Sequence, residues 1–284
     1  MQTLISAQSL RDELDELDEL DSQDLILLDC RFYLTDLDKA AKEYQKAHIP
    51  GAIFVDVHHH LASPETPLSG RHPLPLASDF SHYLKSIGIT SNSNVVVYDD
   101  MSGAIAARAW WMLSQNNIKT RVLDGGLKAW LALEGEMVTD IVSPTRAQEA
   151  LSISFPWAVS EAAVLENMET EGFQLIDARA NDRFEGQNET IDAIAGHVPG
   201  ALNRPFSKNL NSDGLFVTPS ELAISFDEYG SDNESVHYCG SGITACHNVL
   251  ANVLSGGDNT RVFVGSWSQW SKRMQRLMAE QQES

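Results

Sequence analysis

The sequence is poor in cysteine and in basic residues, and both shortages restrict what the protein can do. Its 284 residues include 3 cysteines, too few for a disulfide framework. Lysine and arginine number 20 against 40 acidic residues, which gives a formal net charge of -20. Because nucleic-acid binding requires clustered basic side chains, this charge argues against a nucleic-acid partner and against anionic membrane surfaces.

Long apolar runs are also missing. No run approaches the roughly 20 residues that span a bilayer, and residues 1–10 lack the basic and apolar regions of a secretory signal. We therefore expect a cytoplasmic protein with no membrane partner. The adjacent histidines His58, His59 and His60 have no second ligand motif, and adjacent side chains point in different directions. A solvated turn is favoured there over a metal site, and no cofactor is expected.

The two halves of the chain repeat the same motifs, and this repeat predicts the fold. An apolar run ending in Asp-x-Arg, a His-(Ile/Val)-Pro-Gly-Ala segment, a second strand-like run and a Gly-(Gly/Ser)-x-x-x-Trp segment occur in each half, in the same order. Strands that alternate with helices predict an α/β fold of tandem domains, each a mostly parallel sheet flanked by helices. We expect a first domain over 1–135, a linker over 136–156 and a second domain over 157–284.

An acidic segment over residues 12–21 repeats a three-residue unit that contains Leu14, Leu17 and Leu20. The favoured interpretation is a helix whose leucines form one stripe docked on the first domain, with the acids as its solvated face. A partner-binding or frayed acidic tail is the alternative.

One cysteine lies in a loop suited to a reactive thiol. The strand-like run 235–238 is followed by Cys239-Gly240-Ser241-Gly242-Ile243-Thr244 and then by an alanine-rich stretch typical of a helix. A thiol at such a turn faces backbone N–H groups and the positive end of a helix dipole, and both stabilise the thiolate. The two glycines let the backbone curl around one atom. We expect Cys239 to be the nucleophile, with the rest of the loop, including the hydroxyls of Ser241 and Thr244, around the sulfur.

The other half of the chain has no equivalent nucleophile. Asp99 stands at the position that corresponds to Cys239, and an aspartate cannot carry sulfur. The first half is therefore predicted to be an inactive scaffold. Cys246 follows Cys239 by about two helical turns, where a buried helix cysteine is favoured over a resolving thiol.

The tandem motifs, with one cysteine loop in the second half only, resemble the two-domain rhodanese family over residues 25–270. This resemblance implies that Cys239 accepts a sulfane sulfur, becomes a persulfide and passes the sulfur to cyanide, a small thiol or a thioredoxin-like protein. The loop is similar to the Cys-Gly-Ser-Gly-Val-Thr loop of the family's 3-mercaptopyruvate sulfurtransferases. Members that prefer thiosulfate typically carry Cys-Arg-Lys-Gly-Val-Thr. The uncharged loop favours the monoanionic mercaptopyruvate, and the dianionic thiosulfate is the alternative donor.

The resemblance also implies a cationic partner for the donor. Arg183, in Asp-Arg-Phe, matches the arginine with which the family binds the donor's anionic end, and a guanidinium suits a carboxylate. The mercaptopyruvate enzymes usually carry a second arginine nine positions later, where this chain has Asp192. Arg204 is a candidate substitute.

A Ser–His–acid relay has been proposed for the family, and two of its positions match here. Ser241 and His72 fall on the serine and the histidine. The acid position aligns with His58, although Asp56 is near in sequence. The alternative for His72 is an exposed loop histidine.

Three other function classes compete with sulfur transfer. A cysteine phosphatase or arsenate reductase needs an arginine at the end of the loop, and positions 245 and 246 are alanine and cysteine. A non-enzymatic sulfur carrier or binding module is disfavoured by the intact Cys239 and Arg183. A nucleophilic Ser241 is weaker still, because the thiol two residues earlier is the better nucleophile.

Overall fold

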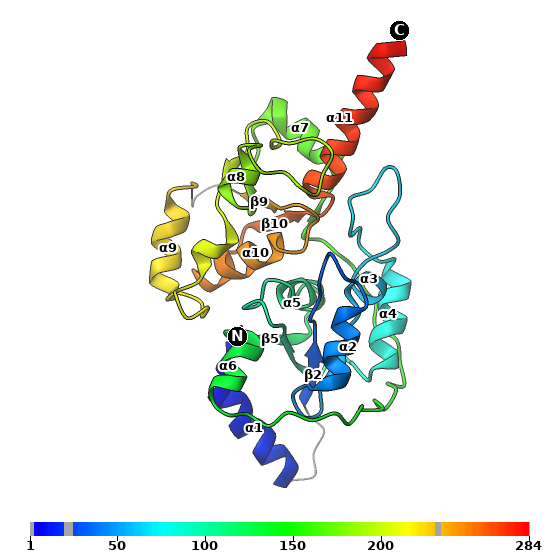
Figure 1. The fold of residues 1–284 in the computed structure, drawn as a ribbon, viewed down its shortest axis with the longest axis vertical. Coiled ribbons are helices and arrows are strands. Elements are labelled where there is room, and N and C mark those ends of the chain that lie inside the picture. Colours follow the sequence, from blue (N-terminus) through cyan, green and yellow to red (C-terminus); the bar gives the residue numbers. More distant parts are fainter. Residues whose placement is uncertain (1–2, 20–24, 231–233, 284) are drawn as a thin grey trace. The chain divides into compact units, whose positions relative to one another are not determined.

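The chain divides into two compact units (Figure 1). The structure is a computed structural model that describes residues 3–19, 25–230 and 234–283. Unit 1 comprises Met1–Ala62, Pro75–Pro156 and Ser212–Phe216, and unit 2 comprises Ser63–Leu74, Trp157–Asn211 and Val217–Ser284. Each unit thus includes a short segment from the other half of the chain, which the repeat in the sequence does not predict.

Each unit contains a parallel sheet with helices around it. In unit 1 the strands are β1 (Leu4–Ile5), β2 (Leu25–Asp29), β3 (Ile53–Phe54), β4 (Asn94–Tyr98) and β5 (Lys119–Leu123), and the helices are α1 (Ala7–Glu19), α2 (Lys39–Lys46), α3 (Val57–His60), α4 (Ala77–Ser86), α5 (Ala106–Ser114) and α6 (Gly126–Ala132). The strand order is β1-β5-β4-β2-β3, and every pairing is parallel among the described residues.

Unit 2 repeats this arrangement. Its strands are β6 (Ala158–Val159), β7 (Gln174–Asp177), β8 (Leu202–Asn203), β9 (Ser235–Tyr238) and β10 (Thr260–Phe263), and its helices are α7 (Glu161–Thr170), α8 (Asn181–Phe184), η1 (Phe206–Asn209), α9 (Pro219–Asp227), α10 (Ala245–Leu254) and α11 (Ser266–Glu283). The order β6-β10-β9-β7-β8, again parallel among the described residues, matches that of unit 1 strand for strand. The predicted α/β class, with two parallel sheets flanked by helices, is confirmed.

The Asp-x-Arg motifs end the central strands β2 and β7 with buried ion pairs. The Asp29 carboxylate accepts bonds of 2.6 to 3.1 Å from the backbone N–H and the guanidinium of Arg31. Asp177 binds Arg179 over the same range of distances. All four residues are buried, so the two pairs fix the ends of the matching strands in both units.

The acidic segment begins in helix α1, as predicted, but its acids are not all solvated. Leu14 packs on the apolar core of unit 1 and Leu17 is half-buried, while Leu20 lies outside the described residues. The Glu13 carboxylate receives bonds of 2.6 and 2.7 Å from the buried Arg121 guanidinium. This bidentate pair adds a polar attachment to the leucine contact.

The segment 63–74, from the first half of the chain, is hydrogen-bonded to α11; both belong to unit 2. The Arg71 backbone N–H donates to Ser268 Oγ at 3.1 Å, and side chains of α11 donate to backbone carbonyls of the segment. These donors are Gln269 to Leu68 at 2.9 Å, Lys272 to Thr66 and Ser69 at 3.1 and 3.0 Å, and Arg276 to Pro67 at 3.0 Å. A Cβ at Gly70 would lie 2.3 Å from the Gly265 carbonyl oxygen, so only glycine permits this approach.

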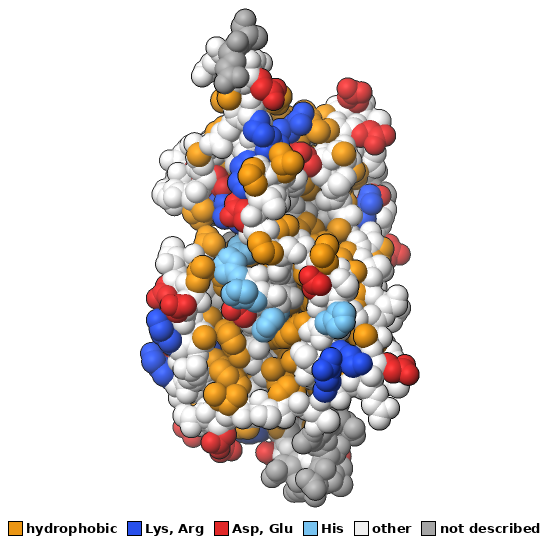
Figure 2. Space-filling model, turned by 90° about the vertical axis from the view of Figure 1, so that its right-hand side faces the viewer, with side chains coloured by type: hydrophobic (Ala, Val, Ile, Leu, Met, Phe, Trp, Pro, Cys, Tyr) orange, Lys and Arg blue, Asp and Glu red, His pale blue; other side chains and the backbone are white. Residues whose placement is uncertain are grey.

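The surface mixes residue types. On the face shown in Figure 2, acidic, basic and histidine side chains form small groups among apolar and uncharged ones. The His59 side chain, 80% exposed, pairs with Asp56 at 2.9 Å. Within the described ranges, no helix has the length and apolar character needed to cross a membrane.

Candidate functional site

The loop that begins at Cys239 joins the carboxyl end of β9 to α10, and the start of α11 fixes its backbone. The Cys239 N–H donates to Ser266 Oγ at 3.1 Å, and the Trp267 N–H donates to the Cys239 carbonyl oxygen at 3.0 Å. The Ser268 N–H donates to the Gly240 carbonyl oxygen at 2.9 Å. These bonds connect the loop to α11 as well as to α10, which follows it in the chain.

The Cys239 sulfur lies inside the curl of its own loop. The Gly242 N–H donates to Sγ at 3.2 Å, and the residue is only 2% exposed. In the same loop Ser241 is buried and Thr244 is half-buried. The sequence prediction that the loop curls around one sulfur atom thus has a direct geometric counterpart.

Gly242 lets the loop close. Its φ is +79°, and a Cβ there would lie 2.3 Å from the Val264 carbonyl oxygen. We expect Gly242→Ala to displace the loop, to lower stability by about 1–3 kcal/mol and to abolish chemistry at Cys239. Gly200→Ala is the matched control, because Gly200 has the same φ of +79° with no atom within 4 Å of its Cβ position. Equal losses in the two variants, in thermal melts and activity assays, would contradict the role of the contact with Val264.

The corresponding turn in unit 1 shows what this geometry binds. The Asp99 oxygens accept four backbone N–H groups at 2.7 to 2.8 Å. The Leu127 N–H donates to the Asp99 carbonyl oxygen at 2.7 Å, as Trp267 does to Cys239. Burial raises the pKa of the Asp99 carboxyl, although the four N–H bonds act in the opposite direction. In unit 1, therefore, a strand-to-helix turn of this design surrounds a carboxylate with backbone donors.

Arg183, predicted to bind the donor, lies on α8 beside the cysteine loop. A Cβ placed on Gly240 would be 3.7 Å from both Nη1 and Nη2 of Arg183. Its Nε and Nη2 donate to the buried Glu189 carboxylate at 2.8 to 3.2 Å. Within the described part of the chain Nη1 has no hydrogen-bond partner, so one edge of the guanidinium still faces the site.

Arg71 lies even closer to the loop and is not among the site residues predicted from the sequence. Its Nη2 would be 3.0 Å from the same Cβ on Gly240, and its Nη1 pairs with Asp192. Position 192, where the second arginine was expected, therefore holds a carboxylate that pairs with Arg71. The only signal in the sequence was that Arg71 precedes His72.

Arg204 does not lie where the sequence analysis suggested. Its guanidinium is fully buried and bonded to Asn209, Asn248 and Ser225, and it stacks over Phe226 at 3.7 Å. Burial lowers the pKa of Arg204 to about 10. A side chain enclosed in this way cannot reach a donor, so the suggestion that Arg204 replaces the second arginine is wrong.

Three other residues that the sequence raised as candidates are His72, Asp56 and Cys246. His72 is 1% exposed and so is not an exposed loop histidine. The Asp56 carboxylate caps α3 by accepting the N–H groups of His58 and His59, which commits it to a structural role. Cys246 is fully buried on α10 and contacts the Gly242 carbonyl oxygen at 3.5 Å, as the favoured interpretation expected. No group of His, Cys, Asp or Glu among the described residues could hold a metal ion.

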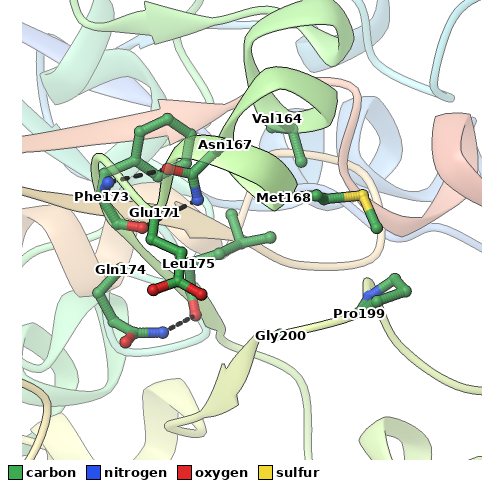
Figure 3. A pocket seen from close by; sticks show the side chains of 9 residues that line it. All are labelled: Val164, Asn167, Met168, Glu171, Phe173, Gln174, Leu175, Pro199 and Gly200. Carbon is green, nitrogen blue, oxygen red and sulfur yellow. Dashed lines mark hydrogen bonds between the residues drawn. The ribbon is translucent and has the colours of Figure 1, made fainter.

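A pocket of about 510 Å³ lies elsewhere in unit 2 (Figure 3). It is lined by α7, by the start of β7 and by Pro199 and Gly200. Asn167 on its wall bonds to the backbone of Phe173 at 2.9 Å in both directions. Because β7 and β9 are parallel and Cys239 follows the carboxyl end of β9, this pocket lies at the opposite end of the sheet. It is not part of the cysteine site.

Comparisons with known proteins agree with this architecture. A family model described as a rhodanese-like domain matches residues 8–133 and 160–273. A probable 3-mercaptopyruvate sulfurtransferase of Pseudomonas aeruginosa is 42% identical over 263 residues, which cover 90% of this chain and 92% of that protein. A thiosulfate sulfurtransferase of Rattus norvegicus is 35% identical over 260 residues, covering 88% and 86%. The solved 3-mercaptopyruvate sulfurtransferase from Leishmania major is similar with a TM-score of 0.85 at 27% identity, over 99% of this chain and 77% of that one. The chain therefore belongs to the rhodanese-like family, with two copies of the domain, and is a sulfurtransferase.

Proposed function

We propose that the chain takes sulfur from 3-mercaptopyruvate through a persulfide on Cys239 and delivers it to a thiol or to cyanide. The observation that supports this most is the Cys239 sulfur held by the Gly242 N–H beside a guanidinium with a free edge. Cyanide, a small thiol and a thioredoxin-like protein are the proposed acceptors.

The first half-reaction transfers one sulfur atom. The Cys239 thiolate attacks the donor sulfur, a sulfur–sulfur bond forms, and the donor's carbon–sulfur bond breaks. The electron pair of the broken bond remains on the organic fragment as the enolate of pyruvate, which takes a proton from water and leaves as pyruvate. The enzyme keeps the persulfide, whose outer sulfur gives the proton of the donor thiol to the hydroxide that the enolate leaves and then carries the negative charge. Backbone N–H groups of the loop stabilise this charge, as those of the Asp99 turn stabilise a carboxylate.

The second half-reaction restores the thiolate. A nucleophile, such as an acceptor thiolate or cyanide, attacks the outer sulfur of the persulfide. The sulfur–sulfur bond breaks, its electron pair returns to the Cys239 sulfur, and the product leaves as an acceptor persulfide or thiocyanate. Since Cys239 ends the cycle unchanged, no external oxidant or reductant is consumed.

The donor preference follows from the uncharged loop. Residues 240–244 contain no lysine or arginine, so a dianionic donor gains no cation from the loop itself. Thiosulfate is the second candidate, since a relative at 35% identity is named a thiosulfate sulfurtransferase. A kcat/KM for mercaptopyruvate that exceeds the value for thiosulfate on one preparation would support the proposal. The reverse order would mean that thiosulfate is the preferred donor.

Further elements of the proposal concern the two units. We propose that unit 1 is catalytically inactive, because the Asp99 carboxylate fills its turn and cannot accept sulfur. The domain limits proposed from the sequence are 1–135 and 157–284, joined by 136–156.

A cytoplasmic location is also proposed, since all three cysteines are free thiols and a persulfide enzyme needs its reactive cysteine in the reduced form.

Removal of the Arg183 guanidinium should weaken donor binding. Arg183→Ala is expected to raise the KM for mercaptopyruvate roughly tenfold to a hundredfold, because a charge-assisted hydrogen bond contributes about 1.5–3 kcal/mol. Steady-state kinetics with mercaptopyruvate measure this change. Arg183→Lys is the conservative control and should restore only part of the binding, since lysine lacks the forked donors. An unchanged KM in the alanine variant would mean that the donor binds elsewhere.

A further inference from the structure

We propose that Arg71 is the second donor-binding arginine of this enzyme and that Asp192 holds it in place. The inference rests on the proposed function, since it assigns the group that binds the donor's carboxylate. It replaces the expectation that this arginine is missing or supplied by Arg204.

Arg71 reaches the site because the segment 63–74 is attached to α11. The Arg71 N–H bonds to Ser268 Oγ at 3.1 Å, and the neighbouring N–H of Ser268 bonds to the Gly240 carbonyl oxygen at 2.9 Å. One residue of α11 therefore connects the backbone of Arg71 to the backbone beside Cys239. This short connection fixes the arginine relative to the nucleophile.

The guanidinium of Arg71 places one terminal nitrogen beside the loop and leaves its Nε unpaired among the described residues. Its Nη1 is committed to Asp192, whereas its Nε is buried and has no hydrogen-bond partner in the described part of the chain. Its Nη2 is the atom that would lie 3.0 Å from a Cβ on Gly240. The Nη2 N–H groups beside the loop are therefore the ones that the carboxylate of mercaptopyruvate would accept from.

Arg71 and Arg183 are arranged in the same way. Each gives one edge to a buried carboxylate, Asp192 for Arg71 and Glu189 for Arg183, and each keeps N–H groups within 4 Å of the Gly240 position. Asp192 Oδ2 also lies 3.7 Å from Arg183 Nη2, so the two pairs are adjacent. Together they form a clamp of two guanidinium groups whose free edges converge on the backbone next to Cys239.

The charge of this clamp favours a monoanion. Two arginines and two carboxylates sum to zero, and the carboxylate side chains are only 6% and 1% exposed. A neutral cluster offers directed N–H donors without a net positive field. A carboxylate with one charge gains from such donors, whereas a dianion such as thiosulfate would face two nearby carboxylates without a compensating excess of cations.

Asp192 explains how the arginine can come from a different segment. At the position where related mercaptopyruvate enzymes usually carry arginine, this chain carries an acid that binds an arginine brought in by residues 63–74. The Arg71 guanidinium thereby lies beside position 192, although the residue at position 192 is not an arginine. Replacing Arg71 alone would leave the buried Asp192 with only the 3.7 Å contact to Arg183, so the test includes a variant that removes this charge.

The test measures the two half-reactions separately in the full-length protein. Arg71→Met should raise the KM for mercaptopyruvate roughly tenfold or more. The rate at which enzyme previously loaded with sulfur transfers it to cyanide should change much less than the KM for mercaptopyruvate, because the acceptor step binds no carboxylate. The double variant Arg71→Met/Asp192→Arg should recover most of the lost affinity by placing an arginine at position 192.

Arg276→Met is the matched control. Arg276 also binds the segment 63–74, at the Pro67 carbonyl oxygen, but pairs with neither carboxylate of the clamp. A KM increase of equal size in this control would mean that loosening the segment is sufficient, and would overturn the role of the Arg71 guanidinium. An unchanged KM in Arg71→Met, or no recovery in the double variant, would also overturn it.

The proposed function has its own readout. Wild-type protein treated with mercaptopyruvate should gain the mass of one sulfur atom on Cys239. Absence of this gain would overturn the proposed function, whereas its presence together with an unchanged KM in Arg71→Met would overturn the Arg71 assignment alone.

Discussion

Cys239→Ser is expected to lose sulfur transfer by roughly a thousandfold or more, because a serine hydroxyl does not form a persulfide and is a far weaker nucleophile than a thiolate. The variant should fold normally, since the backbone bonds from Cys239 to Ser266 and Trp267 do not involve the sulfur. Mass spectrometry after donor treatment should show the gain of one sulfur atom in the wild type and none in the variant.

Cys246→Ser is the control for this experiment. Cys246 is the other cysteine near the loop, fully buried on α10, and its contact is with the Gly242 carbonyl oxygen. A serine keeps a donor at that position, so persulfide formation should persist. Turnover by Cys239→Ser, or a sulfur gain that depends on Cys246, would contradict the mechanism.

Asp99→Ala should have the largest effect on stability. The Asp99 carboxylate accepts four backbone N–H groups in the interior of unit 1, and alanine leaves all four without that acceptor. The expected loss is roughly 3–5 kcal/mol, less than the sum of four unsatisfied donors, because burial of the carboxylate is itself unfavourable. Denaturant unfolding followed by circular dichroism measures the loss.

Two controls separate this effect from simple loss of charge. Asp99→Asn keeps one acceptor oxygen and should fall between wild type and alanine. Asp100→Ala removes the neighbouring carboxylate and should have a small effect, because among the residues that the structure describes that carboxylate bonds only to the Tyr33 hydroxyl. Equal stability of Asp99→Ala and Asp100→Ala would show that the four N–H bonds contribute little.

The parts of the site that lie close together in sequence could be predicted from sequence. Cys239 and Gly242 lie three positions apart, and the strand-to-helix turn that brings the Gly242 N–H to the sulfur is a local structure. The Asp-x-Arg pairs are likewise local, with Asp177 and Arg179 two residues apart. Apolar runs that end at such motifs also predicted the parallel sheets, because buried parallel strands require apolar side chains on both faces.

The errors concern residues whose position depends on distant contacts. Arg204 follows a strand, as a donor-binding residue could, but Asn209, Ser225 and Asn248 enclose it. No local pattern indicates which side of the strand end an arginine will occupy. Its burial is a result of how η1, α9 and α10 pack together.

The sequence by itself determined the family and the repeated α/β fold and gave Cys239 as the candidate nucleophile, because the repeated motifs, the apolar runs and the cysteine loop can each be recognised within a short stretch of chain. Only the tertiary structure decided which arginines face that nucleophile. Arg71 lies 197 residues before the Ser268 that fixes its backbone. The pairing of Asp192 with Arg71 likewise depends on how the segment 63–74 packs, and the sequence around Asp192 does not indicate it. Side chains so distant along the chain meet through the packing of whole elements, which spacing and composition do not encode.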